Sequence, residues 1–404
     1  MQYEPLGKLY YKSRETYEAV YTARYHNADV IRLNFTVNEN PAFLVPNTQL
    51  WTLITEILRI DKRVEHLRSG LPGIALEQFS RRCLVDEIVL TNDIEGVNST
   101  RREIHEVLEK LESQEVKQKK RFDGLVRQYL RLRKAEDIPL TDCREMRDLY
   151  NELVLPDIMQ DNPADCPDGQ YFRKEAVSVM SPSQKEIHRG VQPESKIIEA
   201  MEQALRFLND DSVEILIRIS VFHYLFGYIH PFYDGNGRLS RFISSYLLSR
   251  TLDPLVSYRL SYTIKDNIRT YYDSFKICND RRNRGDITPF VLAFLEIIKE
   301  AMHQLEYALE KRTVDLQEYC ERMQSDSLLG DEKYKNLTFV LLQAALFSDD
   351  GISEKELRTG MHLSYTTLKK RLNALDEHKY LLIQTRGREK LYQLDIAALE
   401  KLTD

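Results

Sequence analysis

The stretch that decides the fold is His230-Pro-Phe-Tyr-Asp234-Gly-Asn-Gly-Arg238-Leu-Ser-Arg241. Pro231 ends the apolar helix before it, and the two glycines allow the positive φ angles of a tight turn. A helical period resumes at Leu239, so the loop opens onto a helix N-terminus. Backbone N–H groups in such a loop bind oxyanions, and the helix dipole adds to the attraction. We therefore expect a phosphate site at Gly235, Asn236 and Gly237.

The charged side chains of this stretch predict nucleotidyl-transfer chemistry. Arg238 and Arg241 lie three apart on the side of the helix opposite its apolar face, so two guanidinium groups can bind two phosphates. Asp234 is a hard oxygen ligand suited to Mg²⁺. His230 suits a general base, because an unperturbed histidine has a pKa of about 6.5.

Two other kinds of glycine-loop site are excluded. An EF-hand needs a glutamate twelve positions into the loop, where Ser245 stands. A P-loop needs a Lys-Ser or Lys-Thr pair after the glycines, and none follows. Asn236-Gly237 alone is typical of a turn, and His230 alone is typical of a core histidine, so the prediction depends on the combination.

Residues 230–241 match the signature of the Fic family, HPFx(D/E)GNGRxxR, at every fixed position, and the resemblance extends over roughly residues 49–316. Fic enzymes typically transfer AMP from ATP to a protein hydroxyl and release pyrophosphate. The resemblance implies that His230 takes the proton from a Ser, Thr or Tyr hydroxyl and that Asp234 holds Mg²⁺. It implies nucleotide contacts at Gly235, Asn236, Gly237, Arg238 and Arg241, and base contacts at Tyr271 and Tyr272. It also implies a flap that docks the target by strand addition, formed by Val177, Ser178, Val179 and Met180.

A second motif lies upstream, Thr91-Asn-Asp-Ile-Glu95-Gly96, and is similar to the family's inhibitory motif (S/T)xxxE(G/N). Thr91 and Glu95, four apart, share one helical face, and Gly96 ends the helix directly after them. A carboxylate at that helix end can reach Arg241 and occupy the guanidinium that should bind the γ-phosphate. We therefore predict an autoinhibited enzyme with Thr91, Glu95 and Gly96 as the inhibitory residues.

The periodicity of the chain predicts a mainly α fold in three domains. Residues 1–134 form an N-terminal helical region with the inhibitory motif, and residues 135–325 form a Fic helical bundle with a small β-hairpin flap. Residues 326–404 form a winged helix-turn-helix, with helices near 339–347, 354–358 and 365–375 and strands near 380–383 and 390–394. Residues 333–404 carry twelve Lys and Arg against ten Asp and Glu, a net charge of only +2. The possible DNA contacts are Lys369, Lys370, Arg371, Arg386 and Arg388.

The composition of the 404 residues is that of an ordinary water-soluble globular protein, with 42% hydrophobic residues. The 57 Lys and Arg against 63 Asp and Glu give a net charge of −6, so the whole chain lacks the basic excess of a nucleic-acid binder. Five cysteines without a CxxC pair fit a reduced compartment. Neither a signal peptide nor an apolar run of membrane length is visible, so we expect a cytoplasmic protein without a membrane partner.

The leading hypothesis is an autoinhibited protein adenylyltransferase that uses ATP and Mg²⁺ and modifies another protein or itself. One alternative is a nucleotide-sensing DNA-binding regulator with a winged helix. Another is a Fic enzyme that uses a different nucleotide donor, or one that removes AMP with Glu95 positioning water. Intact Gly235 and Gly237 favour AMP transfer, since relatives that phosphorylate usually change this region. A homodimer is possible, and five tyrosines between residues 10 and 25 suggest that the N-terminus packs onto the core.

Overall fold

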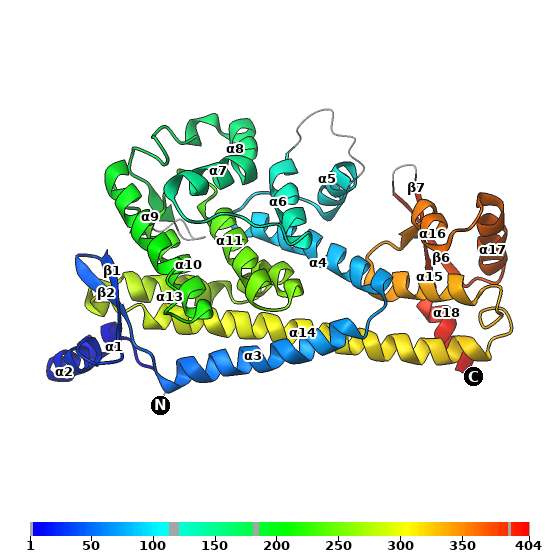
Figure 1. Cartoon of the computed structure of the whole chain (residues 1–404), viewed down its shortest axis with the longest axis horizontal. Coiled ribbons are helices and arrows are strands. Elements are labelled where there is room, and N and C mark those ends of the chain that lie inside the picture. Colours follow the sequence, from blue (N-terminus) through cyan, green and yellow to red (C-terminus); the bar gives the residue numbers. More distant parts are fainter. Residues whose placement is uncertain (1–2, 113–120, 181–185, 387–388, 404) are drawn as a thin grey trace. The chain divides into compact units, whose positions relative to one another are not determined.

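The computed structural model describes residues 3–112, 121–180, 186–386 and 389–403. As predicted, the fold is mainly helical, and the sheets among these residues are three and small (Figure 1). The chain divides into two compact units, the first formed by Met1–Asp61 with Val85–His303 and the second by Lys62–Leu84 with Gln304–Asp404. This grouping differs from the three predicted domains, because residues 62–84 group with the C-terminal residues. The three-domain division stays a prediction.

Three long helices contribute residues to both units: α3 (Thr48–Ser69), α4 (Gly73–Ile94) and α14 (Thr288–Ser325). The other elements of the first unit are α1 (Leu6–Lys12), α2 (Arg14–Tyr25), β1 (Ile31–Val37), β2 (Asn40–Leu44), α5 (Arg101–Glu112), α6 (Asp123–Arg133), α7 (Cys143–Leu153), α8 (Leu155–Asp161), η1 (Pro163–Asp165), β3 (Ser178–Met180), β4 (Glu186–Arg189), α9 (Glu194–Leu208), α10 (Ile215–Ile229), α11 (Asn236–Thr251), η2 (Pro254–Tyr258), α12 (Leu260–Asp266), α13 (Ile268–Asn279) and η3 (Arg281–Asn283).

The centre of the first unit is α10, whose sequence is apolar on every side and whose residues are nearly all buried. Helices α9 and α11 pack against it. The predicted capping box starts α5, because Glu103 N donates to Thr100 Oγ1 at 3.2 Å and Thr100 N donates to Glu103 Oε2 at 2.8 Å. The predicted hairpin is present as β3 and β4, which pair antiparallel.

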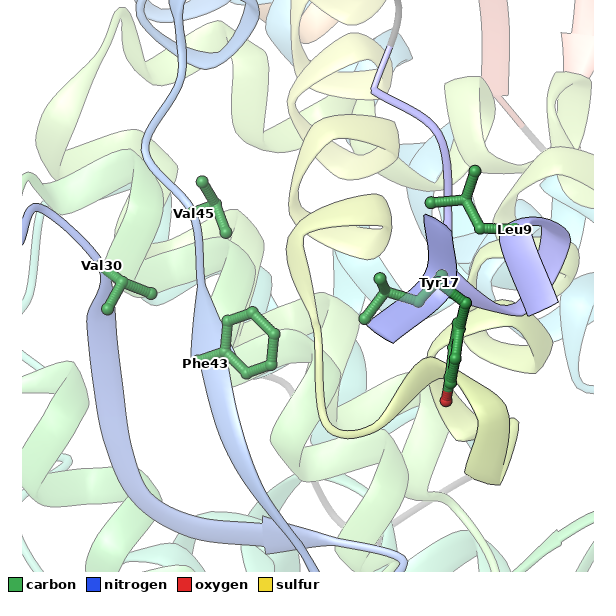
Figure 2. Close-up of a cluster of buried hydrophobic side chains, with 6 residues drawn as sticks. Leu9, Tyr17, Val30, Phe43 and Val45 are labelled. Carbon is green, nitrogen blue, oxygen red and sulfur yellow. The ribbon is translucent and has the colours of Figure 1, made fainter. Parts of the chain in front are cut away.

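The N-terminal segment forms two helices and a hairpin that pack together. In the hairpin β1 pairs with β2 through a tight turn at Asn38 and Glu39, both of which have positive φ. Figure 2 shows the apolar cluster that joins the helices to the hairpin, with Leu9, Tyr17, Val30, Phe43 and Val45 labelled. Of the five tyrosines expected to pack, Tyr17, Tyr21 and Tyr25 contact this cluster, whereas Tyr10 and Tyr11 are exposed.

The second unit contains the predicted order of C-terminal elements and one additional strand. Its elements are α15 (Lys335–Phe347), β5 (Ile352–Ser353), α16 (Glu354–Met361), α17 (Tyr365–Glu377), β6 (Leu381–Arg386), β7 (Glu389–Leu394), α18 (Ile396–Glu400) and η4 (Lys401–Thr403). The strands form one sheet in the order β5-β7-β6. Ser353 and Glu356 form a capping box at α16, and Ser364 caps α17. The winged-helix assignment stays a prediction.

Among the described residues, no helix combines the length and the apolar character that crossing a bilayer requires.

Phe43 is the test of the N-terminal packing, because its side chain is fully buried and packs edge-to-face against the rings of Tyr21 and Tyr25. We expect Phe43→Ala to lower the free energy of unfolding by about 3–5 kcal/mol through a cavity, and Phe43→Leu by less than about 1.5 kcal/mol. Urea unfolding of each variant measures this. Tyr11→Ala is the control, since Tyr11 is 72% exposed. Equal stability of Phe43→Ala and Tyr11→Ala would contradict the packing.

Candidate functional site

The signature loop joins α10 to α11 through two residues in left-handed conformation. His230 ends α10 with φ 52° and ψ 64°, and Gly235 precedes α11 with φ 79° and ψ 3°. A Cβ atom on Gly235 would lie 2.5 Å from Val154 Cγ1, so the position requires glycine for its φ angle and for space. Asn236 closes the loop, because its side chain accepts from Phe232 N at 3.0 Å and donates to Phe232 O at 2.8 Å.

A cavity of about 270 Å³ opens beside this loop. Its walls include nine of the predicted site residues: Glu95, Val177, Ser178, His230, Asn236, Gly237, Arg241, Tyr271 and Tyr272. They also include six residues that the sequence did not single out as site residues: His188, Gly227, Tyr233, Ser240, Phe275 and Asn279. The predicted residues Asp234, Gly235, Arg238, Thr91 and Gly96 are not part of these walls.

His230 is half-buried in the cavity wall. Desolvation lowers its pKa to about 4, although the carboxylate of Glu95 opposes this effect. The imidazole is therefore neutral at pH 7 and can accept a proton. This is the protonation state that a general base needs.

Arg241 is buried in α11, and α4 supplies its partners. Its Nη2 lies 2.8 Å from Glu95 Oε1 and donates to Thr91 O at 2.9 Å, and its Nε donates to Thr91 Oγ1 at 2.8 Å. Burial alone would lower the pKa of Arg241, but Glu95 holds it above its ordinary value. The ion pair that the spacing of Thr91 and Glu95 predicts is present, and Gly96 ends α4 with φ 73°. The inhibitory role of the three residues stays a prediction.

Gly237 makes room for the carboxylate of Glu95. A Cβ atom on Gly237 would lie 2.0 Å from Glu95 Oε1 and 2.9 Å from Arg241 Nη1. The glycine therefore lets the helix end of α4 and the first turn of α11 approach closely.

Arg238 is buried. Arg238 and Arg241 were predicted on the side of their helix opposite its apolar face, and each is no more than 2% exposed, because α11 is covered on all sides. Arg238 Nη1 lies 3.8 Å from Asp157 Oδ2, and its Nη2 lies 3.5 Å from Asp234 Oδ2. The structure thus directs Arg238 toward these carboxylates rather than into the cavity wall.

Asp234 fits a cation whose other ligands come from a nucleotide and water. Its side chain is 43% exposed, and one carboxylate oxygen accepts the N–H of Gly235. Among the described residues no three His, Cys, Asp or Glu side chains gather as a metal cluster. A single exposed carboxylate suits Mg²⁺, which keeps several waters and binds phosphate oxygens.

The aromatic wall of the cavity is fixed by hydrogen bonds behind it. Tyr271 Oη lies 2.7 Å from His223 Nε2, and His223 Nδ1 lies 2.8 Å from Ser244 Oγ. Burial lowers the pKa of His223 to about 3, so this histidine is neutral and has a structural role. Tyr224 Oη donates to Asn279 Oδ1 at 2.8 Å, which leaves the amide group of Asn279 as the donor toward the cavity.

Glu87 is a buried carboxyl group near the site that sequence reasoning missed. It accepts hydrogen bonds from Ser261 N at 2.8 Å, from Ser261 Oγ at 2.6 Å and from Tyr129 Oη at 3.2 Å. Burial raises its pKa to about 7. Its signal in the sequence is the four-residue spacing Glu87, Thr91, Glu95, which places all three side chains along one face of α4.

The structure describes four of the five residues predicted to contact DNA. On α17, Lys370 is exposed, while Lys369 and Arg371 are half-buried. Arg386 on β6 pairs with Asp350 at 3.3 Å, and Arg388 lies outside the described residues. Lys370 is therefore the fully exposed member among the four that the structure describes.

The chain was compared with known proteins. Residues 141–248 match the model of the Fic/DOC family. The chain is 36% identical over 94 residues to a Protein adenylyltransferase Fic of Drosophila erecta, which is 22% of this chain and 17% of that protein. It is 42% identical over 69 residues to the protein of the same name from Aedes aegypti, 17% of this chain and 12% of that protein. The match thus spans less than a fifth of the length of either curated relative.

Among solved structures, a Fic family protein from Desulfovibrio desulfuricans G20 is similar to this chain. The sequence identity is 20% and the TM-score is 0.52, over 87% of this chain and 97% of the other. At this identity the likeness shows the fold alone.

The stability of the chain should depend on the protonation of Glu87. Its pKa is about 7 in the folded protein and ordinarily 4.5, so the folded state binds more protons between these values. The contribution of Glu87 to stability should therefore fall by about 2–3 kcal/mol as the pH rises from 4.5 to 7. Urea unfolding over this range should show a difference between wild type and Glu87→Gln that changes with pH, while other titrating groups such as His223 cancel in that difference.

The matched control is Asp93→Asn, which removes an exposed carboxylate from the same helix. A Glu87→Gln difference as independent of pH as that of Asp93→Asn would contradict the raised pKa.

Proposed function

We propose that this chain, which contains a Fic domain over residues 141–248, is a protein adenylyltransferase. It transfers AMP from ATP to a Ser, Thr or Tyr hydroxyl of a protein and releases pyrophosphate. The observation that carries the proposal is that a neutral His230 and the buried guanidinium of Arg241 line one cavity with Gly237, at the N-terminus of α11. The names of the curated relatives support the same chemistry.

His230 acts as the general base in this mechanism. Its neutral imidazole takes the proton from the acceptor hydroxyl while the hydroxyl oxygen attacks the α-phosphorus atom. The new P–O bond forms as the bond to the oxygen that bridges the α- and β-phosphates breaks. Pyrophosphate then leaves with the bonding electrons.

The first turn of α11 binds the phosphates. The N–H groups of Asn236, Gly237 and Arg238 have no carbonyl four residues earlier within the helix, and the helix dipole favours an anion at this end. Arg241 binds the outermost phosphate through its guanidinium. Asp234 would hold Mg²⁺, which would neutralise phosphate charge.

The two remaining walls of the cavity select the base and the acceptor. Tyr271, Tyr272 and Phe275 provide aromatic surface for a nucleobase. Strand β3 pairs with β4 in a two-stranded sheet, of which β3 forms one edge. An extended acceptor segment can add to that edge through main-chain hydrogen bonds, along Val177, Ser178, Val179 and Met180.

Glu95 inhibits the enzyme by occupying Arg241. The carboxylate takes the place that the γ-phosphate needs, at a guanidinium that is only 1% exposed. ATP bound beside Glu95 is therefore held without its outer contact, in a nonproductive pose.

Removing the Glu95 carboxylate should activate transfer. We expect Glu95→Gly to raise AMP transfer about 10- to 100-fold, since the freed Arg241 gains a charge-assisted contact of roughly 1.5–3 kcal/mol with ATP. His230→Ala in the Glu95→Gly protein should abolish the gain. The measurement is transfer of label from ATP labelled on the α-phosphate, with Mg²⁺, to the chain itself and to proteins of a cell lysate.

Asp93→Asn is the matched control, because Asp93 is an exposed carboxylate in the last turn of α4 and pairs with Lys265 of α12. It should leave transfer at the wild-type level. Equal transfer by wild type and Glu95→Gly would refute the inhibitory role, and label transferred from the γ-phosphate instead would make the chain a kinase. No label in any protein would favour a nucleotide-sensing regulator.

The rate should be insensitive to pH around neutrality. With a pKa of about 4, His230 stays unprotonated at neutral pH. Protonation of His230 should therefore cause no loss of kcat/KM in Glu95→Gly between pH 8 and pH 6. Because Glu95 raises the pKa of His230, its removal moves the acid limb to a still lower pH. Rates between pH 4.5 and 8, with circular dichroism as the control for folding, check this. An acid limb near 6.5, the ordinary value for histidine, would contradict it.

A further inference from the structure

Arg173 is a fully buried arginine that lies behind the signature loop. It precedes the predicted flap in the sequence and is not part of the cavity wall. Within the described part of the chain, every hydrogen-bond acceptor that the structure gives its side chain is a backbone carbonyl oxygen. A cation buried among carbonyl groups alone is costly, which suggests that it is kept for a purpose other than stability.

The carbonyl groups belong to two parts of the site, the end of α10 and the base of the β3–β4 hairpin. Nε donates to His230 O at 2.9 Å and Nη2 to Ile229 O at 3.4 Å, at the end of α10. Nη1 donates to Glu175 O at 2.6 Å and Nη2 to Val191 O at 2.9 Å. Glu175 and Val191 stand before β3 and after β4, so one guanidinium joins both ends of the hairpin to His230.

The backbone around Arg173 reinforces the same junction. Arg173 N donates to Pro231 O at 3.1 Å, and Val191 N donates to Ile229 O at 3.0 Å. Gly190 N closes the base of the hairpin by donating to Val177 O at 3.0 Å. The position of the hairpin base relative to His230 is thus set by the side chain of Arg173 together with these backbone hydrogen bonds.

We propose that Arg173 is a positioning residue, which holds the backbone of His230 and the base of the β3–β4 hairpin in one arrangement. The hydroxyl of an acceptor segment docked along β3 then meets the imidazole of His230. This inference rests on the proposed function, because it assigns a role in the same transfer step.

The chemistry of the position requires an arginine. Four acceptors at fixed directions need the planar guanidinium with its five N–H donors, and a lysine ammonium offers three donors from one point. His230 is a non-glycine residue with φ 52°, a conformation that persists only where its surroundings hold it. The hydrogen bond from Arg173 Nε to the His230 carbonyl provides that support.

The positive charge of Arg173 also affects the imidazole of His230, because it lowers the pKa of that ring. Three charged or titratable groups face His230: Arg173, Glu95 from α4 and His188 from β4. Arg173 and His188 lower the pKa of His230, while Glu95 raises it. Arg173 therefore helps to keep the base neutral as well as placing it.

The test uses Arg173→Lys and Arg173→Gln in the Glu95→Gly protein, where transfer is measurable. We expect kcat to fall about 10- to 100-fold in both, the size of effect that a misplaced catalytic group produces. KM for ATP should stay within about twofold, since Arg173 is not in the cavity wall. Arg173→Gln should also move the acid limb of kcat/KM to higher pH, whereas Arg173→Lys, which keeps the charge, should move it less.

Arg218→Lys is the matched control, because Arg218 lies on α10, has a side chain that is only 13% exposed and also donates to a backbone carbonyl, Leu208 O at 3.1 Å. It should leave kcat unchanged. Gly190→Ala is a second probe that keeps Arg173, since its Cβ would lie 2.3 Å from Arg173 Nη2 and 3.1 Å from His230 Cβ. It should lower kcat without changing the charge. Thermal unfolding confirms that each variant is folded.

A kcat for folded Arg173→Lys within twofold of its parent would overturn the inference. If the Glu95→Gly parent transfers no AMP at all, the proposed function fails, and NMR titration of the histidine rings then tests Arg173 by itself. The His230 ring, assigned by its loss in His230→Gln, should shift in chemical shift and rise in pKa in Arg173→Gln. An unchanged His230 signal in that variant would overturn the positioning role.

Discussion

The site depends on one constraint, which is that the buried guanidinium of Arg241 must be paired with an anion. At 1% exposure Arg241 cannot be hydrated, and an unpaired charge there would cost several kcal/mol. In this structure Glu95 supplies the negative charge, with Thr91 completing the hydrogen bonds. The end of α4 therefore lies against the first turns of α11 because Arg241 holds it there, and Gly237 leaves the space that this approach needs.

The face of α4 that carries Glu95 has a second anchor two turns earlier. Glu87 binds Ser261 at the start of α12 and Tyr129 on α6, and all of these groups are buried. Breaking these bonds would leave a carboxyl group unsatisfied in the interior, which is expensive. Moving Glu95 does not carry this cost, since its side chain is 23% exposed and water can reach it. It is followed by Gly96, whose φ of 73° ends the helix. In the proposed mechanism, exchange of Glu95 for a phosphate oxygen therefore concerns only the last turn of α4, while Glu87 holds the rest of the helix in place.

The sequence predicted what local chemistry determines, and it failed where distant residues decide. Pro231 and the glycine at 235 define the loop through their own backbone angles, and Thr100 with Glu103 defines a helix start, so these features could be predicted. The burial of Arg238 could not be predicted, because a period in apolar residues cannot show that other helices cover the polar side of α11. Arg173 was missed for a related reason: its partners are backbone carbonyl groups up to 57 positions away, and carbonyl groups leave no trace in a sequence.

The proposed mechanism requires a site whose charge balance survives the exchange of one anion for another. Arg241 is satisfied by Glu95 before ATP binds and by phosphate afterwards, so the resting and active states differ in which anion is present rather than in whether the arginine is paired. The exchange also changes the pKa of His230, because Glu95 raises that pKa and Arg173 lowers it. When the carboxylate moves away, the nearby protein charge shifts in favour of the neutral imidazole. In the proposed mechanism, the step that frees Arg241 for the nucleotide therefore leaves His230 in the neutral form that it already has beside Glu95.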